Sequence, residues 1–528
     1  MTSENGSPSE RTIWNKLGLV LGPVLAALTM WWMWPGDEAT TGTENPFNIA
    51  AVAGITVWMA IWWITEAIPL GATALLPLVL LPLFRVQTTS AVASAYAGDL
   101  IFLFLGGFLV ALAIEESGLH RRVALTIVAA MGDHPRRIVF GFMLATAALS
   151  MWLSNSATTM MLLPIAASVL AQADRCSAHS HRNFGVTLML GVAYGASIGG
   201  VATIVGTPPN AYFRSQFASE FVSRGAPDFS FGGWMVVALP MAAIFLVGSW
   251  WLLTRWIFPL DPKPLFGGSN VIREELRALG KMSCDERKMA LIFATTATLW
   301  ILREPVAGWG WAPLLGVGRE MIDEKSQVWF SDGAVAILMG LVCFAVPSAS
   351  HRGRGILEWK ATRRLPWEVL LLFGGGMALA AAMRESGFAA FAGKQLGDAL
   401  SGMPAISQVL VCSGTMTAAT EMTSNLASVQ ISLPILKEAA IANGRDPRLL
   451  MLPTTLAASW AFMLPVATPP NAIVYGSGRV TIRDMLKAGV VMNILGIVLI
   501  VIAMFALAVP IFDIQLTGAP DWAVPKPE

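Results

Sequence analysis

The sequence predicts an all-α polytopic membrane protein, with about 11 transmembrane helices and two re-entrant hairpins arranged as an inverted repeat. Three observations lead to this class. Hydrophobic residues make up 55% of the 528 residues and Asp, Glu, Lys and Arg only 13%, which is about half the charged share of a soluble domain. Uncharged stretches long enough to cross a bilayer recur along the chain. Polar motifs of the first half return, in the same order, in the second half.

The composition also excludes several classes of function. The formal net charge is +1 and the basic residues are scattered, so no nucleic-acid partner is expected. The four cysteines lie far apart and form no CxxC motif, which argues against a disulfide scaffold or a cysteine metal site. The expected partners are therefore the lipid bilayer and a small molecule.

Apolar stretches locate the membrane crossings, because each matches one passage through a hydrocarbon core about 30 Å thick. The stretches are 17–36, 45–65 and 67–84, followed by others centred near 100–115, 184–206, 232–254, 289–302, 333–348, 366–383, 449–466 and 488–511. The first stretch is too long for a signal peptide, and no small-residue cleavage site follows it.

Two apolar runs do not fit a single crossing. Ile138 to Ala173 carries no charge, and Ala399 to Leu436 carries only Glu421. Each run is too long for one helix and too short for two full crossings with a turn. Each also has a polar cluster near its middle, which survives at membrane depth only inside protein or beside water. We therefore expect re-entrant hairpins over 138–173 and 404–436.

Lysine and arginine set the expected orientation. If the N-terminus is cytoplasmic, most of the 35 basic residues fall in cytoplasmic segments, as the positive-inside rule requires. The C-terminus is then external. On this map the first hairpin opens toward the cytoplasm and the second toward the outside.

Three motifs recur in the two halves of the chain. They are Gly106–Gly118 with Gly375–Gly387, Ser154-Asn155 with Ser424-Asn425, and Thr207-Pro208-Pro209-Asn210 with Thr468-Pro469-Pro470-Asn471. An odd number of crossings separates the starts of the two copies. The second copy is therefore expected upside down relative to the first, as in many transporters.

The repeat gives the expected division of the chain. Residues 1–47 form an N-terminal tail and the first transmembrane helix, and 259–288 form a cytoplasmic amphipathic linker. The first repeat spans 48–258, with its hairpin at 138–173 and a broken helix at 184–222. The second spans 289–513, with its hairpin at 404–436 and a broken helix at 449–478. Residues 514–528 form the C-terminal tail.

The duplicated motifs suggest a binding site. Thr-Pro-Pro-Asn inside an apolar run must break its helix, which frees carbonyl groups at one half-helix end and N–H groups at the other. The Ser-Asn tips add hydroxyl and amide oxygens, which suit a hard cation such as Na⁺. Together they predict a site at the membrane midplane for a cation and an anion. The alternative is that Ser and Asn only join helices and the prolines only kink them, but packing gives no reason to duplicate both in register.

At these residues the chain resembles the divalent anion:sodium symporter family of di- and tricarboxylate carriers. The resemblance covers nearly the whole chain and is carried by Trp62–Pro69, the paired Ser-Asn tips and Ala461–Asn471. It implies Na⁺ as the coupling ion, a homodimer and an elevator mechanism, in which hairpins and broken helices slide on a scaffold.

The resemblance also implies site residues. The first sodium site would use Ser150, Ser154, Asn155 and Gly206, and the second Thr420, Thr423, Asn425 and Ala467. The substrate carboxylates would contact Asn155, Ser156, Thr207, Pro208, Ser424, Asn425, Thr468 and Pro469. The family's tips usually read Ser-Asn-Thr, whereas this chain has Ser156 and Leu426 at the third position. At Leu426 a hydroxyl that could donate to a substrate carboxylate is missing, and an apolar side chain takes its place.

Two further residues have competing interpretations. Glu421 precedes the second Ser-Asn by three residues and could carry a proton, although a buried acid satisfied by hairpin amides or a nearby cation is favoured. Gly195-Ala196-Ser197-Ile198-Gly199 matches the GxSxG of serine hydrolases. It lacks a preceding strand and a histidine partner, so close helix packing is favoured and no enzyme is expected.

The expected function is sodium-coupled uptake of C4-dicarboxylates (succinate, malate or fumarate) across a plasma membrane of the bacterial inner-membrane type. Two alternatives share the fold: a sodium-independent dicarboxylate exchanger, and a carrier of citrate or another divalent anion. An ion channel is a more distant alternative. The proposed site holds no lysine or arginine, which favours a co-bound cation because two carboxylates at midplane need compensation.

Overall fold

The computed structural model describes residues 13–34, 46–176, 182–261, 268–305, 309–322 and 325–524. Parts of all five predicted segments lie outside the described residues. They are 1–12 and 35–45 of the N-terminal segment 1–47, 177–181 of the first repeat 48–258, 262–267 of the linker 259–288, 306–308 and 323–324 of the second repeat 289–513, and 525–528 of the tail 514–528.

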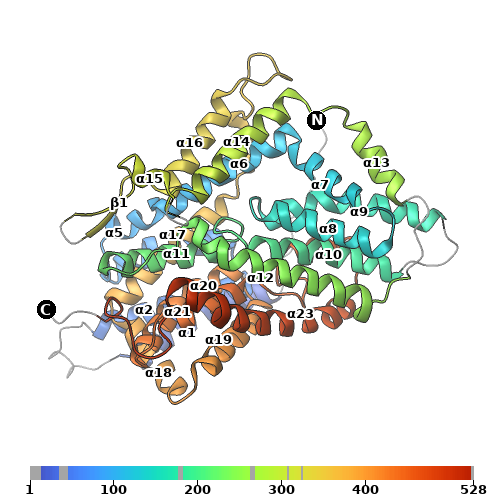
Figure 1. Ribbon diagram of the computed structural model, residues 1–528. Helices are drawn as coiled ribbons and strands as arrows, with labels where there is room; N and C mark the ends of the chain where they lie inside the picture. The colour runs from blue at the N-terminus through green and yellow to red at the C-terminus, as the bar shows by residue number, and fades with distance from the viewer. Residues whose placement is uncertain are drawn as a thin grey trace.

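The first half of the chain is helical (Figure 1). Its elements are α1 (Ile13–Trp32), α2 (Pro46–Thr65), α3 (Leu70–Thr73), α4 (Leu76–Leu83), α5 (Thr89–Ser94), η1 (Ala95–Ala97), α6 (Asp99–Ser117), α7 (Leu119–Ala130), α8 (Pro135–Ser150), α9 (Asn155–Cys176), α10 (Arg182–Gly200), α11 (Pro208–Phe221), η2 (Val222–Arg224), α12 (Phe231–Leu252) and the π-helix η3 (Leu253–Ile257).

The second half follows the same plan, with one small sheet. Its elements are α13 (Gly268–Ala278), α14 (Cys284–Ile301), α15 (Trp311–Leu314), β1 (Arg319–Ile322), β2 (Lys325–Val328), α16 (Asp332–Ala345), η4 (Trp359–Arg364), α17 (Trp367–Glu385), α18 (Phe388–Leu400), α19 (Ala405–Thr420), α20 (Asn425–Ala442), α21 (Arg448–Ala458), α22 (Pro469–Gly476), α23 (Ile482–Ala503), the π-helix η5 (Met504–Ala508) and α24 (Val509–Phe512). The antiparallel pair β1–β2, with Arg319 opposite Val328, is a departure from the all-α prediction.

Equivalent glycines turn the chain at the same point in each half. Gly118 follows α6 with φ +77° and Gly387 follows α17 with φ +78°. Only glycine adopts this left-handed conformation without steric cost, and it commonly ends a helix. The next helix then starts at once, as α7 or α18. The sequence match between Gly106–Gly118 and Gly375–Gly387 thus reflects a shared backbone turn.

Seven helices of the described chain are long and apolar enough to cross a membrane. They are 13–32, 47–65, 89–117, 155–174, 231–257, 367–385 and 482–512. Three shorter apolar segments, 70–83, 332–345 and 448–458, coincide with predicted crossings. The predicted number of about 11 stays a prediction, because several expected crossings are interrupted or short: 184–206 breaks after Gly200 and 449–466 after Ala458.

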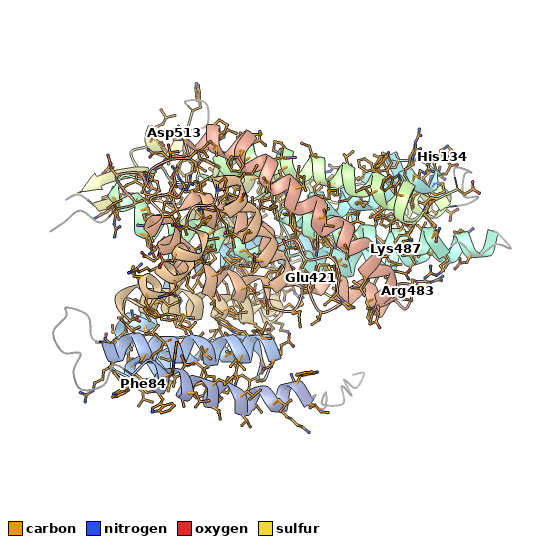
Figure 2. All side chains as sticks on the ribbon, turned by 90° about the horizontal axis from the view of Figure 1, so that it is seen from below. Phe84, His134, Glu421, Arg483, Lys487 and Asp513 are labelled. Carbon is orange, nitrogen blue, oxygen red and sulfur yellow. The ribbon has the colours of Figure 1, made fainter. Side chains whose placement is uncertain are left out.

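Helix α1 lies at the edge of the molecule, where α1 and α2 run together (Figure 2). Its buried face is made of Gly18, Gly22 and Ala26, and the Trp62 indole N–H donates to Gly18 O at 3.0 Å. The large apolar side chains of α1 are mostly exposed. An exposed apolar helix of this length fits contact with lipid.

Helix α10 lies at the centre of the fold, and all residues from Phe184 to Gly200 are buried. A Cβ added at Gly195 would lie 2.7 Å from Met143 O, and one at Gly199 would lie 2.3 Å from Ala147 O. Both positions therefore require glycine, because α8 passes directly over them. The structure confirms that the GxSxG match at 195–199 is a helix-packing seam.

The predicted linker 259–288 is divided between two helices. Helix α13 packs against α7, where Arg121 pairs with Glu275 at 2.6 Å. Helix α14 begins at Cys284, and Ser283 forms a capping box with Glu286. The last residues of the predicted linker therefore belong to the first helix of the second half.

A buried ion-pair network joins α11 to α16. The Asp332 carboxylate accepts from Arg303 Nε at 2.6 Å and from Arg214 Nη1 at 2.5 Å. Arg319 of β1 pairs with Asp228 at 2.5 Å, and Asp228 lies 3.6 Å from Arg214. The Asp332 side chain is 2% exposed. Buried charges of this kind are tolerated only while they stay paired.

Asp332→Asn is expected to destabilise the protein by about 3–5 kcal/mol, because it removes the charge that compensates two buried guanidinium groups. The measurement is the Tm of purified protein in detergent. Asp398→Asn is the matched control, since Asp398 is exposed and makes no ion pair among the described residues. Equal Tm values for the two variants would show that the network contributes little.

Candidate functional site

Two helical hairpins have the same construction. Helices α8 and α19 are each 16 residues long, and each is followed by a turn, 151–154 or 421–424, before α9 or α20 begins at an asparagine. The turns fall within the predicted hairpins 138–173 and 404–436, although the helices extend to 135–176 and 405–442. That each hairpin returns to the same membrane side stays a prediction.

The asparagine of each tip faces the end of the preceding helix. Ser150 Oγ donates to Asn155 Oδ1 at 2.5 Å, and Thr420 Oγ1 lies 2.6 Å from Asn425 Oδ1. Both contacts join residues five apart across the turn. Each tip therefore brings a hydroxyl and an amide oxygen together, as the sodium-site prediction requires for these four residues.

At both helix breaks, the asparagine side chain of Thr-Pro-Pro-Asn hydrogen-bonds to backbone carbonyls of the interrupted helix. Asn210 Nδ2 donates to Val201 O at 3.1 Å and Thr203 O at 2.8 Å. Asn471 Nδ2 donates to Ala461 O at 3.2 Å and to the carbonyl of residue 464 at 3.0 Å. Each asparagine side chain thus satisfies carbonyls freed by the break. Both are fully buried, and their Oδ1 atoms have no hydrogen-bond partner in the structure.

The paired prolines change the expected chemistry of the breaks. Pro208–Pro209 and Pro469–Pro470 occupy the first positions of α11 and α22, and proline has no N–H. The N–H of Asn210 is bonded to the carbonyl of the threonine three residues before it at 3.2 Å. In the second motif, the N–H of Asn471 donates to Thr468 Oγ1 at 3.4 Å. These half-helix starts therefore offer an anion fewer donors than the sequence suggested.

The hairpin tips keep more free donors. In α9, Ser154 accepts from Ala157 N at 3.2 Å and from Thr158 N at 3.0 Å. The N–H groups of Asn155 and Ser156 have no acceptor inside the described helix. Helix α20 starts after Ser424 without a side-chain cap, and the N–H of Ser428 donates to the Ser424 carbonyl at 3.0 Å. An anion near the tips would meet backbone donors and the positive ends of two helix dipoles.

The first predicted cation site is compact. A Cβ added at Gly200 would lie 2.7 Å from Asn155 Oδ1 and 3.1 Å from Gly206 O, and one at Gly206 would lie 2.3 Å from Gly200 O. The missing side chains thus let two backbone carbonyls and the tip amide approach one another. Ser150 contacts Asn155 directly, and Asn155 and Gly206 both lie beside Gly200. The oxygens of these residues suit a hard cation such as Na⁺.

The second predicted cation site is less closely assembled. Thr420 Oγ1 lies 3.0 Å from Ala458 O as well as near Asn425. Thr423 Oγ1 instead contacts Ser428 Oγ at 2.5 Å and Ala419 O at 2.9 Å. Ala467 is buried within the second break. The structure therefore joins Thr420 and Asn425 directly, whereas no hydrogen bond links Thr423 or Ala467 to them among the described residues.

The two halves meet at their breaks. Thr207 Oγ1 of the first break lies 3.4 Å from Ser459 Oγ of the second, and the Tyr194 hydroxyl donates to Phe462 O at 2.9 Å. Gly200, at the end of α10, lies beside Asn155 of the first tip, and the carbonyl of Ala458 accepts from Thr420 beside the second tip. Each break therefore lies against the tip of its own half, and the two breaks contact each other.

The remaining predicted substrate residues differ between the halves. Ser156, at the start of α9, is half-buried, whereas Leu426 is 5% exposed and belongs to the apolar core. This burial indicates that the Leu426 side chain packs against the apolar neighbours of the hairpin. Pro208 and Pro469 stand at the first helical positions of α11 and α22, and Thr468 caps α22.

Glu421 is a buried acid at the second tip, in the interior of the molecule (Figure 2). Its Oε1 accepts from Phe462 N at 2.8 Å and from Asn493 Nδ2 at 2.7 Å. Its Oε2 accepts from Met463 N and Leu464 N, both at 3.1 Å. The carboxylate therefore holds the hairpin tip to the second break. The amides that satisfy it come from that break and not from the hairpin, and no cation pairs with it among the described residues.

Sequence reasoning did not identify three of these groups. Thr203 Oγ1 donates to Met151 O at 2.5 Å and accepts from Gly206 N at 3.0 Å, which ties the first break to the first tip. Asn493 of α23 contributes to the Glu421 cluster. The asparagine side chains of the two Thr-Pro-Pro-Asn motifs close the breaks. An asparagine in an apolar helix, such as Asn493, is the signal that could have been followed.

The model of the sodium:sulfate symporter transmembrane region matches residues 21–512. The sodium-dependent dicarboxylate transporter SdcS of Staphylococcus aureus, strain bovine RF122 / ET3-1, is 40% identical over 498 residues, which are 93% of this chain and 90% of the relative. SdcS of strain NCTC 8325 / PS 47 has the same identity and coverage.

Two solved structures have a similar fold. MtrF of Neisseria gonorrhoeae has a TM-score of 0.52 and 13% identity, with 98% of each chain covered. The YdaH transporter of Alcanivorax borkumensis has a TM-score of 0.52 and 14% identity, with 95% of this chain and all of the other covered. At this identity the likeness concerns the fold alone.

Asn155→Ala and Asn425→Ala are each expected to abolish sodium-dependent uptake while leaving the protein folded, because each removes the amide oxygen shared with Ser150 or Thr420. Uptake into proteoliposomes and the elution profile of the purified protein are measured together. Asn183→Ala is the control, because Asn183 lies at the exposed start of α10. Near-normal sodium dependence in either tip variant would place the site elsewhere.

Glu421→Gln is expected to lower the Tm and the uptake rate together, because the glutamine amide turns a donor toward backbone N–H groups. Each buried donor left without an acceptor costs about 1–3 kcal/mol. Glu274→Gln, at an exposed position of α13, is the control.

The pH dependence of uptake between pH 6 and 8 separates this structural role from proton transfer. A structural role leaves the shape of the profile unchanged in Glu421→Gln. An unchanged Tm with a flattened pH profile would instead identify Glu421 as a proton carrier.

Proposed function

Because this chain belongs to the family of the sodium:sulfate symporter transmembrane region, we propose that it carries C4-dicarboxylates such as succinate, malate or fumarate inward with Na⁺ by an elevator mechanism. The resemblance to the divalent anion:sodium symporters is confirmed by the family match and by the dicarboxylate transporters that share 40% of its sequence. The family and these relatives are transporters and not enzymes. Sodium-dependent dicarboxylate transport is the function that they support.

The observation that carries the proposal is the duplicated contact at the tips. Ser150 with Asn155 and Thr420 with Asn425 form the same pair in both halves, at 2.5 and 2.6 Å. A packing role alone would not require both pairs to lie beside a helix break. The oxygens of these pairs fit Na⁺, and the helix starts beside them fit a carboxylate.

The charge distribution favours coupling to a cation. The residues assigned to substrate include no lysine or arginine, and Glu421, a buried charge three residues before Ser424, is negative. A dicarboxylate would bring further negative charge into this interior. Bound sodium ions would offset that charge, so substrate binding without Na⁺ is expected to be weak.

The elevator mechanism makes a demand on the contacts of α11. Arg214 of α11 pairs with Asp332 of α16, and Glu220 of α11 lies 3.2 Å from Arg384 at the end of α17. If α11 moves with the hairpins while α16 and α17 belong to the scaffold, both pairs must separate in each cycle. Arg384 is exposed, so water can compensate its charge, but the buried Arg214–Asp332 pair would resist separation.

The remaining parts of the proposal concern assembly and location. We propose a homodimer in a bacterial inner membrane, with the N-terminus in the cytoplasm and about 11 crossings. The family resemblance supports the dimer, and the excess of basic residues in the assigned cytoplasmic segments supports the orientation. Light scattering of the purified protein would give the number of subunits.

The proposed function is tested by uptake of radiolabelled succinate into proteoliposomes. An inward Na⁺ gradient is expected to drive accumulation above the external concentration, and an equal K⁺ gradient is not. Gramicidin, which collapses the Na⁺ gradient, should abolish accumulation. Empty liposomes and the Asn155→Ala variant are the controls.

Three outcomes would favour the alternatives. Uptake that requires internal succinate and is indifferent to Na⁺ would identify an exchanger. Sodium-driven uptake of sulfate or citrate, but not of succinate, would mean that the sodium coupling holds and that the substrate is a different anion. Conductance in a planar bilayer without accumulation would identify a channel.

A further inference from the structure

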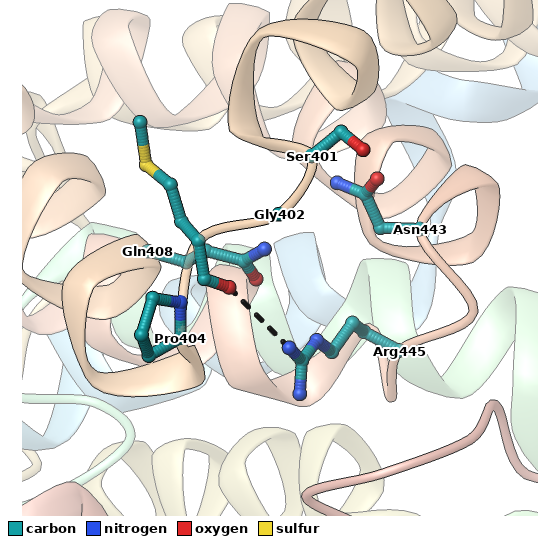
Figure 3. A pocket seen from close by; sticks show the side chains of 7 residues that line it. Ser401, Gly402, Pro404, Gln408, Asn443 and Arg445 are labelled. Carbon is teal, nitrogen blue, oxygen red and sulfur yellow. Dashed lines mark hydrogen bonds between the residues drawn. The ribbon is translucent and has the colours of Figure 1, made fainter.

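The base of the second hairpin contains a hollow that lies apart from the tips. Its volume is about 290 Å³, and its lining comes from the loop that enters α19 and from the segment that leaves α20. Figure 3 shows Ser401, Gly402 and Pro404 on the first of these segments and Asn443 and Arg445 on the second. The two legs of the hairpin therefore meet around this space.

Arg445 supplies the one ionisable side chain of the lining. Its Nη1 donates to Leu516 O at 2.5 Å and its Nη2 to Met403 O at 3.4 Å. The neighbouring carboxylate, Asp446, is committed to Arg448 at 2.6 Å and to Gln515 N at 3.2 Å. Within the described chain no carboxylate pairs with Arg445. Two carbonyls thus fix the half-exposed guanidinium, and no carboxylate of the described residues neutralises its charge.

A second donor in the lining has no acceptor. Asn443 Nδ2 is buried and makes no hydrogen bond in the structure. Ser401 lies beside it, with its hydroxyl toward the same space (Figure 3). Gln408 uses its amide nitrogen on Leu400 O at 3.0 Å. An acceptor placed in the hollow would satisfy Asn443, and a negatively charged acceptor would also compensate Arg445.

We propose that this hollow binds a free oxyanion, such as a small carboxylate, sulfate or phosphate. Arginine held in a fixed orientation recognises the paired oxygens of such groups. A bound oxyanion would bridge the start of α19, the end of α20 and, through Arg445, the C-terminal segment at Leu516. It would thereby hold together the two legs of the hairpin that carries Thr420 and Asn425.

The site lies at the base of the hairpin, far along α19 and α20 from the residues assigned to transport. Binding of an oxyanion in the hollow does not depend on the proposed function. An effect of that binding on transport would rest on the proposed function. Binding is therefore measured without sodium and without transport. Failure of sodium-driven uptake would leave the anion site intact, and failure of the anion site would leave the proposed function intact.

The test is the Tm of purified, delipidated protein in detergent, titrated with potassium phosphate or potassium sulfate against potassium chloride of equal ionic strength. We expect a saturable rise in Tm with phosphate and sulfate for the wild type. In Arg445→Gln the apparent Kd should weaken about tenfold to hundredfold. Arg137→Gln, an exposed arginine at the base of the first hairpin, is the matched control and should behave as the wild type.

Two further variants test the proposal if Arg445→Gln fails to fold. Arg445→Lys keeps the positive charge and should retain a weaker rise in Tm with phosphate. Asn443→Asp places a negative charge in the hollow, which repels an oxyanion, and should abolish that rise. An equal response to phosphate in the wild type and in both Arg445→Gln and Asn443→Asp would overturn the proposal. A rise in Tm with phosphatidylglycerol vesicles but not with free phosphate would also overturn it, because the ligand would then be a lipid headgroup.

Discussion

A helix interrupted inside an apolar interior must satisfy the backbone groups that the interruption frees, and the centre of this protein is organised by that constraint. Both breaks end in Thr-Pro-Pro-Asn, and each asparagine side chain donates to two freed carbonyls. The prolines remove N–H groups that would otherwise need acceptors. The backbone groups that remain available to bind a ligand at the breaks are therefore few and fixed in position.

The two halves solve the same problem with different side chains. In the first, Thr203 ties the break to Met151 at the tip. In the second, the carboxylate of Glu421 takes the N–H groups of three consecutive residues of the break. The residues that follow the two tip asparagines also differ: Ser156 is half-buried, whereas Leu426 lies in the core. The second half thus carries both the negative charge and the apolar side chain at its tip, and the two ends of a bound dicarboxylate would meet unequal surroundings.

Much of the plan could be predicted from the sequence, because local rules govern it. Charge-free stretches locate the apolar helices, and Thr-Pro-Pro-Asn locates the breaks after Gly200 and Ala458. The contacts that close the site could not be predicted in this way. Glu421 and Asn493 are 72 residues apart, and Arg214 and Asp332 are 118 apart, so only the folded chain brings them together. The β1–β2 pair was also missed, since four-residue strands carry too little periodicity to be recognised.

If the two hairpins reach one site from opposite sides of the membrane, their bases face opposite compartments, and accessibility labelling can establish this. Single cysteines replace Arg182, beside the base of the first hairpin, and Arg445, at the base of the second, in a chain whose four native cysteines are substituted. A membrane-impermeant maleimide is applied to intact cells and to inside-out vesicles. We expect position 445 to be labelled in intact cells and position 182 only in inside-out vesicles. Labelling of both positions from the same side would contradict it.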